Sequence, residues 1–281
     1  KVVFTLNCTH SINAVLKGVL KKGDHVVVSG LEHNSVMRPL EKSGINYDTF
    51  YVYREDAKTL EDFKRKIKVN TKLVLTTGAS NVTGKTVPIA EIGKVCKERG
   101  VYFCVDAAQI AGVSDINMQK MNIDYLCIAP HKGLYAPMGI GILICRKPIE
   151  NTIIEGGTGT SSIDFSQPNV LPEMLESGTL NMAGIMGVSA GIDFVKSIGI
   201  NKIRQHEYEL FNRLYNGLSQ NKNVTVYAEN PDIYSYAPVL SFNFSGIPSS
   251  KAVSVLSEHG FALRGGLHCA PTAHKSIGTL P

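Results

Sequence analysis

The chain has 281 residues, of which 43% are hydrophobic and 19% are charged, as is usual for a soluble globular protein. No apolar run is long enough to span a bilayer, and the net charge of +5 is scattered along the chain, so we expect neither a membrane nor a nucleic acid as a partner. This length suits one large domain, or a large domain with a small one.

Strand-like and helix-like segments alternate along the first half of the chain. Apolar, β-branched runs predict strands at 2–6, 25–29, 47–52, 72–77, 102–105, 125–128 and 140–145. Stretches of helical pattern between them predict helices at 11–20, 34–43, 57–68 and 89–99. This alternation predicts an α/β fold with a mainly parallel, mixed sheet.

Residues 150–180 are rich in Gly, Ser and Thr, which predicts a long functional loop. After it, helices are predicted at 184–198, 203–220 and 250–259, and strands at 224–227 and 239–244. We therefore expect a large domain at residues 1–180 and a smaller C-terminal α+β domain at residues 181–281. Because the chain begins inside a strand and stops without a terminating element, we expect it to be part of a longer protein, with each domain incomplete at one end.

The cysteines are the next informative feature. None of the six forms a Cys-x-x-Cys pair, so neither a zinc site nor a thioredoxin-like motif is indicated, and we expect no metal. Four of them lie in or beside apolar stretches, which predicts buried thiols: Cys96, Cys104, Cys127 and Cys145. This usage is typical of a reducing compartment, and we expect the protein to be cytoplasmic.

Polar residues follow the predicted strands. In a parallel sheet, ligands bind beyond the carboxyl ends of the strands, so these positions are the candidates for a site. They are Asn7 to His10, Glu32 to Asn34, Ser80 and Asn81, Asp106 to Gln109, and Ala129 to Lys132.

Lys132 and Asp106 are the most informative of these residues. Most lysines are solvated surface residues, but Lys132 follows a strand in an otherwise uncharged segment, and a partly desolvated amine is a usable nucleophile. Asp106 could cap a helix, or it could pair with a protonated pyridine nitrogen, the contact that makes pyridoxal phosphate an electron sink. Gln109 could donate to the cofactor's phenolic oxygen. The segment 7–11, which runs from a strand into a helix, could bind a phosphate or could be a simple cap.

Residues 129–141, Ala-Pro-His-Lys-Gly-Leu-Tyr-Ala-Pro-Met-Gly-Ile-Gly, resemble the Schiff-base lysine motif of the class V aminotransferases, and specifically of the cysteine desulfurase and selenocysteine lyase group. Further matching motifs follow in the family's order over nearly the whole chain, at 7–13, 32–35, 80–84, 105–109, 175–181 and 264–270. The resemblance implies a pyridoxal-phosphate-dependent transferase fold of type I.

By position, the resemblance also implies roles for individual residues. Lys132 would hold pyridoxal 5′-phosphate as a Schiff base, and His33 would stack on its pyridine ring. Asn81 and Gln109 would contact the phenolic oxygen side, and Thr9, His10 and His131 would hold the phosphate. Thr179 would reach the phosphate of the neighbouring subunit, which implies a homodimer. Arg264 would bind the carboxylate of the substrate through a bidentate pair.

Cys269 falls where the desulfurases carry the cysteine that attacks the substrate's sulfur and becomes a persulfide. It could also be an incidental thiol near the site. Arg264 and His268 could stabilise its thiolate, and the surrounding Gly and Pro residues are typical of a mobile loop. The implied reaction converts L-cysteine to L-alanine, with the sulfur left on Cys269 for a possible protein acceptor.

Three alternatives stay open. The chain could be a selenocysteine lyase, another class V enzyme such as an aminotransferase, or a non-catalytic relative that only binds a partner. Intact Lys132, Asp106 and His33 argue against the last. Where many desulfurases have a Ser, this chain has Ala129, so we expect one phosphate contact to be missing. The family's second carboxylate-binding Arg would lie beyond Pro281.

Overall fold

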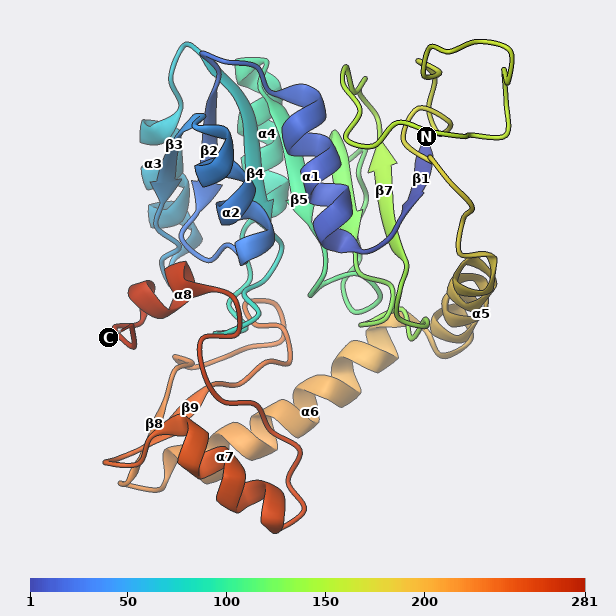
Figure 1. The fold of residues 1–281 in the computed structure, drawn as a ribbon. Helices are drawn as coiled ribbons and strands as arrows, with labels where there is room; N and C mark the ends of the chain where they lie inside the picture. The colour runs from blue at the N-terminus through green and yellow to red at the C-terminus, as the bar shows by residue number, and fades with distance from the viewer. Residues whose placement is uncertain (281) are drawn as a thin grey trace.

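The computed structural model describes residues 1–280. Its main feature is a seven-stranded sheet of order β1-β7-β6-β5-β4-β2-β3 (Figure 1). The strands are β1 (Val2–Thr5), β2 (His25–Ser29), β3 (Asn46–Phe50), β4 (Thr71–Thr77), β5 (Tyr102–Asp106), β6 (Tyr125–Ile128) and β7 (Gly141–Cys145). Strand β7 is antiparallel to both of its neighbours, and all other neighbouring pairs are parallel. The carboxyl ends of all strands except β7 therefore lie at the same edge.

Helices cover both faces of this sheet, so its strands are buried on both sides. On one face lie α1 (Cys8–Val19) and α2 (Asn34–Ser43), and on the other α3 (Asp56–Lys66) and α4 (Ile89–Arg99) (Figure 1). Successive residues of a strand alternate between the two cores. Val26 and Val28 pack with α1 and α2, whereas Val27 packs on the opposite side.

The remaining elements form a smaller part below the sheet in Figure 1. They are α5 (Met182–Ile198), α6 (Ile200–Ser219), α7 (Ser249–Glu258), α8 (Pro271–Ser276) and an antiparallel pair, β8 (Val224–Val226) and β9 (Phe242–Phe244). In residues 1–280 no single helix has the length and apolar character needed to cross a membrane; α5 and α6, bent by 80° at their junction, meet those criteria only as a pair.

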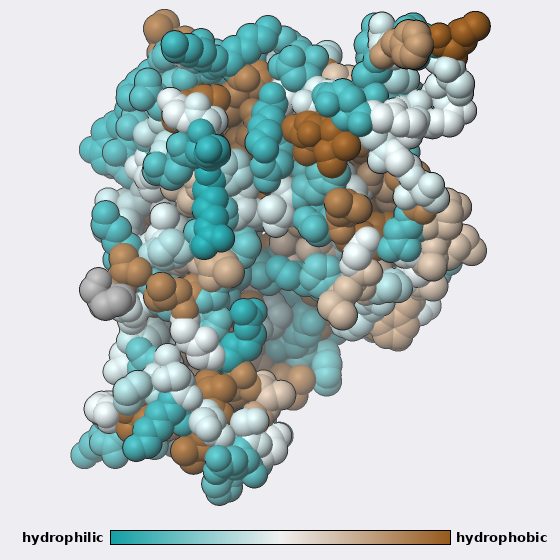
Figure 2. All heavy atoms as spheres, in the orientation of Figure 1, coloured by the Kyte–Doolittle hydropathy of each residue, from teal (hydrophilic) through white to brown (hydrophobic). Residues whose placement is uncertain are grey.

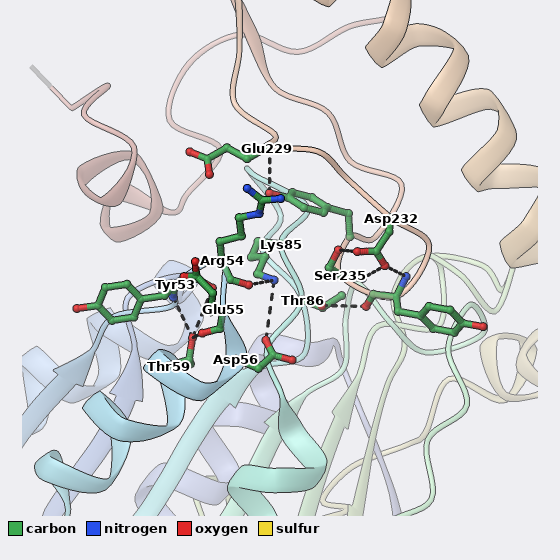
Figure 3. Close-up of polar contacts among 12 residues, drawn as sticks. Tyr53, Arg54, Glu55, Asp56, Thr59, Lys85, Thr86, Glu229, Asp232 and Ser235 are labelled. Carbon is green, nitrogen blue, oxygen red and sulfur yellow. Dashed lines mark hydrogen bonds and ion pairs between the residues drawn. The ribbon is translucent and has the colours of Figure 1, made fainter.

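The loop after β4 joins the two parts. Gly84 O accepts a hydrogen bond from Ala237 N at 2.8 Å, and Ser235 O accepts one from Thr86 N at 3.0 Å. Lys85 between them is buried at this junction, where its Nζ donates to Arg54 O at 3.3 Å (Figure 3). Because this loop begins with Ser80 and Asn81, its attachment to the C-terminal part fixes one side of the candidate site.

The α/β class and the mainly parallel, mixed sheet are confirmed, and every predicted strand and helix is present with shifted ends at most positions. Three differences affect the site. Helix α1 begins at Cys8 rather than Ser11, which places Thr9 and His10 in its first turn. Residues 108–113 form turns, so the helix that Asp106 could have capped is not present there. Helix α8 was not predicted, because its six residues are too few to show a hydrophobic period. The domain division at residue 180 stays a prediction.

Candidate active site

The site is built where the loops after β5 and β6 meet. Asp106 ends β5 and Lys132 lies in the loop after β6, and two glycines let the backbones of the two loops touch. A Cβ on Gly133 would lie 2.3 Å from Ala111 O, and one on Gly112 would lie 1.9 Å from Gly133 O. Gly112 also has a φ of +88°, which other residues rarely adopt. The close approach of these two loops holds the predicted lysine and aspartate at one place.

Asp106 is the last residue of β5 and is almost fully buried. Its Oδ1 accepts a hydrogen bond from Ala108 N at 2.9 Å and lies 3.5 Å from the Sγ of Cys8, which donates to it. Among residues 1–280, no hydrogen bond is formed to Oδ2, so this oxygen is free to accept a hydrogen bond from a ligand. That is the arrangement a protonated pyridine nitrogen requires.

A second carboxyl group, Glu32, lies beneath the site with no exposed surface. Its Oε1 accepts hydrogen bonds from Ser29 Oγ and from Thr77 N, the latter at 2.8 Å, and its Oε2 has no partner in the described chain. Burial raises the pKa of Glu32 to about 8, and the nearby charge of Asp106 adds to this effect. Glu32 is therefore mostly neutral at pH 7.

His33 caps the amino end of α2. Its Nδ1 accepts a hydrogen bond from Ser35 N at 3.0 Å, which leaves the proton on Nε2. Burial lowers the pKa of His33, and the charge of Lys132 lowers it further, against the opposite effect of Asp106. His33 is therefore a neutral, half-buried ring beside both predicted cofactor residues, which suits stacking on an aromatic ligand.

The amino end of α1 faces this site through Cys8. Asn7 caps the helix, because its side chain accepts a hydrogen bond from His10 N at 2.9 Å. Thr9 is exposed in the first turn, where backbone N–H groups and the helix dipole favour a phosphate. Burial lowers the pKa of His10, and burial together with Lys132 lowers the pKa of His131, so both rings are mostly neutral at pH 7. They would then contact a phosphate as hydrogen-bonding groups rather than as cations.

The loop that carries Cys269 is tied to the sheet by hydrogen bonds that the sequence did not reveal. Asn34 N donates to Cys269 O at 2.7 Å, and Asn81 Nδ2 donates to His268 O at 2.8 Å. Thr272 Oγ1, on α8, donates to Glu32 O at 2.9 Å. Cys269 is thus held beside the turn that bears His33. It is exposed, whereas the other five cysteines are buried.

The structure brings most of the predicted residues together but not all. Lys132 and His131 are exposed, and Gln109 is half-buried in the turns after β5. Arg264 lines a cavity of about 340 Å³ with Asn81 and other residues, and it makes no hydrogen bond to the site in the described chain. Thr179 is exposed on the long loop, so a role for it depends on a second subunit.

Four contributing residues were missed by the sequence reasoning: Cys8, Asn34, Thr272 and Glu32. Cys8, Asn34 and Glu32 lie in segments that follow predicted strands and were expected to line the site. Their individual roles depend on contacts between distant parts of the chain, which the sequence does not show. Thr272 is the second residue of α8, a helix too short to be predicted.

The site residues fit pyridoxal phosphate on the chemistry of the groups present. The accessible amine of Lys132 suits its aldehyde, and the buried carboxylate of Asp106, with one free oxygen, suits its ring nitrogen. The neutral ring of His33 suits its ring face, and the amino end of α1 suits its phosphate.

Comparisons with known proteins agree with this fit. The aminotransferase class-V family matches residues 1–279. A probable cysteine desulfurase of Pyrococcus abyssi is 35% identical over 99% of this chain and 71% of its own length. A probable cysteine desulfurase of Methanothermobacter thermautotrophicus is 31% identical with the same coverage. The apo structure of a cysteine desulfurase from Thermococcus onnurineus superposes with a TM-score of 0.88 at 32% identity, over 99% of this chain and 72% of that one. These similarities confirm the predicted transferase fold of type I.

Proposed function

The chain belongs to the class-V aminotransferase family, and we propose that it is a pyridoxal-phosphate-dependent cysteine desulfurase that converts L-cysteine to L-alanine. One observation carries this proposal beyond the family. The only exposed cysteine of the described chain, Cys269, is hydrogen-bonded through its carbonyl to the turn that bears His33. An ordinary aminotransferase would not need a thiol at this place. The named relatives favour a desulfurase over a selenocysteine lyase.

Each residue of the site contributes a defined interaction. We infer that Lys132 binds the cofactor covalently and moves protons, and that the free oxygen of Asp106 keeps its ring nitrogen protonated. When bound, the cofactor supplies an electron sink for the substrate's carbon skeleton. The other inferred contacts are His33 on the ring face, Asn81 and Gln109 at the phenolic oxygen, Thr9, His10 and His131 at the phosphate, and Arg264 at the substrate carboxylate.

Cys269 takes the sulfur in this proposal. Its thiolate attacks the sulfur of the bound cysteine, an S–S bond forms, and the C–S bond breaks with its electron pair left on the carbon skeleton. Protonation of that carbon then gives alanine, and Cys269 is left as a persulfide. Arg264 lies near Cys269 along the loop and is the cation that could stabilise the thiolate. The expected help from His268 is not supported, because burial and the charge of Arg264 lower the pKa of His268 and leave its ring mostly neutral at pH 7.

A homodimer is part of the proposal. Its support is apolar surface on the long loop and on α5, with the hydrophobic loop tip seen at the upper right of Figure 2. These residues are Ile154, Ile163, Phe165, Val170, Met182, Met186 and Phe194. Monomeric proteins rarely expose so many large apolar side chains in neighbouring segments. Thr179 lies between the two segments, where a partner subunit would bring it near a second cofactor.

A reducing cytoplasm and a protein sulfur acceptor complete the proposal. Five buried free thiols favour the reducing compartment, since none of the six cysteines forms a disulfide in the part of the chain described. The exposure of Cys269 supports transfer to a protein, because a persulfide there can be reached from outside.

The test replaces Cys269 and follows both products. We expect Cys269→Ala to keep the cofactor spectrum, to lose alanine formation from cysteine, and to retain some activity on selenocysteine, because selenium leaves more readily. Wild-type protein exposed briefly to cysteine should gain the mass of one sulfur on the peptide that contains Cys269. Cys96→Ala, which removes a buried thiol of α4, is the control and should behave as the wild type. If Cys269→Ala desulfurates cysteine at the wild-type rate, the persulfide mechanism is wrong.

A further inference from the structure

The contact between Cys8 and Asp106 joins residues 98 positions apart in the sequence. Cys8 begins α1, and its Sγ lies 3.5 Å from Oδ1 of Asp106, within the range of a hydrogen bond that involves sulfur. Both side chains are buried, at 9% and 4% exposure. The same Oδ1 accepts the N–H of Ala108, so two donors converge on one oxygen and leave the other for a ligand.

The thiol is the donor in this pair. Burial raises the pKa of Cys8 well above its ordinary value, and the charge of Asp106 raises it further, against a smaller opposite effect of Lys132. The sulfur therefore keeps its hydrogen at neutral pH, and Asp106 is the acceptor of the pair.

The other titratable groups around Asp106 leave this arrangement intact. Glu32 below it is mostly neutral at pH 7, and burial raises the pKa values of Cys104 on β5 and Cys127 on β6. His33, on α2, is neutral because burial lowers its pKa. These neighbouring groups therefore add no charge beside Asp106, and Cys8 donates to it directly.

We propose that Cys8 is a positioning residue of the desulfurase reaction, whose S–H group holds Oδ1 of Asp106 and keeps the carboxylate charged and turned so that Oδ2 faces the cofactor's ring nitrogen. This inference rests on the proposed cofactor. A hydrogen bond donated to a carboxylate favours its charged form, so the proton shared with the ring stays on the nitrogen. A protonated ring nitrogen is the stronger electron sink.

The strength of the hydrogen-bond donor at position 8 then determines how far the ring nitrogen of the cofactor is protonated. Alanine offers no donor, a thiol is a weak one, and a hydroxyl is stronger. Protonation of the ring nitrogen should rise in the order Cys8→Ala, wild type, Cys8→Ser. A purely structural role of Cys8 predicts something else, because Ala and Ser both remove volume and would change the site in the same direction.

The first experiment needs no cofactor. The S–H stretching band of Cys8 is isolated by subtracting the infrared spectrum of cofactor-free Cys8→Ala from that of the wild type. We expect this band to lie at lower frequency than that of Cys145, which is buried on β7 and lacks a carboxylate partner in the described chain. Asp106→Asn should move the Cys8 band towards the Cys145 band. A Cys8 band that does not respond to Asp106→Asn would show that the hydrogen bond is absent and overturn the proposal.

The second experiment uses the holoenzyme loaded with pyridoxal phosphate labelled with ¹⁵N in the ring. The ¹⁵N chemical shift reports ring protonation, and we expect the three proteins to follow the order above. Turnover of cysteine should fall roughly three- to tenfold in Cys8→Ala and be restored in Cys8→Ser. Cys145→Ala, with thermal unfolding of each apoprotein, serves as the control for packing.

The outcomes distinguish a failure of the proposed function from a failure of the proposed role of Cys8. If the wild type does not bind pyridoxal phosphate, the proposed function is wrong, and the infrared result still decides whether the hydrogen bond exists. If the wild type binds it and all three proteins give the same ring signal, the function stands and the role of Cys8 is refuted.

Discussion

Glu32 provides the sharpest test of how the buried site is charged. The change is Glu32→Gln, which keeps the shape of the side chain and removes its proton equilibrium. The amide oxygen of Gln can still accept the hydrogen bonds from Ser29 Oγ and Thr77 N. The substitution therefore leaves the contacts in place and removes only the cost of ionising this carboxyl group without water.

The size of that cost follows from the pKa of Glu32. Burial raises it to about 8, from 4.5 in the unfolded chain, so the folded protein holds a proton that the unfolded chain releases. Stability from this group is fully present below pH 4.5 and is lost as the pH rises towards 8. The loss is about 1.4 kcal/mol per pH unit in that window and on the order of 5 kcal/mol in total. Wild-type and Glu32→Gln proteins should therefore be about equally stable at pH 4.5, with the variant more stable at pH 8.

The assay is urea unfolding of both cofactor-free proteins at several pH values between 5 and 8. Histidines with lowered pKa values, such as His25, also make stability depend on pH in this range, but they act in both proteins and cancel in the difference. Glu61→Gln changes an exposed carboxylate and should give a difference that does not vary with pH. A difference between wild type and Glu32→Gln that stays constant from pH 5 to 8 would refute the assignment of Glu32 as a buried neutral acid.

Three further changes test other parts of the site. Lys132→Ala should remove the visible absorption band of the bound cofactor and the borohydride-reducible bond to the protein, and persistence of both would show that another amine binds it. Asp106→Asn should still bind pyridoxal phosphate but lose most activity, measured as alanine formation, because the ring nitrogen would no longer be kept protonated; an active variant with an unchanged spectrum would leave Asp106 only a structural role. Thr272→Val removes the hydrogen bond to Glu32 O, worth about 1 kcal/mol, and should lower the turnover of cysteine about fivefold through poorer docking of the Cys269 loop. Its control is Ser276→Ala on the same helix, whose hydroxyl bonds only to Ala273 O; an equal loss in both variants would exclude the docking explanation.

The position of the site could be predicted because it depends on local pattern. Alternating strands and helices predict a parallel sheet, and a parallel sheet places the residues after its strands at one edge. Asp106 and Lys132 follow neighbouring strands, β5 and β6, so their proximity results from the order of the elements alone. His33 could be placed in the same way, since it lies between β2 and α2.

The contacts that complete the site could not be predicted, because they join segments far apart in the sequence. Cys8 contacts Asp106 only because α1 packs across β5 and β6, and nothing in the motif at 7–13 indicates which way that thiol points. A backbone hydrogen bond joins the loop that carries Cys269 to residue 34, and such a bond does not depend on which side chains are present, so the sequence cannot indicate it. The proposed role of Thr179 depends on a second subunit, which no pattern within one chain can place.

The conformation of the Cys269 loop bears on how sulfur could leave the site. A residue that takes sulfur at the cofactor and passes it to an acceptor needs docked and undocked arrangements of similar free energy. The hydrogen bonds from Asn34 N, Asn81 Nδ2 and Thr272 Oγ1 favour docking by about 1.5–4.5 kcal/mol together. Against them, His268 and Cys269 have φ values of 49° and 58°, in the left-handed region, which costs about 2–6 kcal/mol for the two residues together. Because these contributions are similar in size and opposite in sign, the docked and undocked arrangements of the loop are close in free energy, which suits the proposed role of Cys269 as a sulfur carrier.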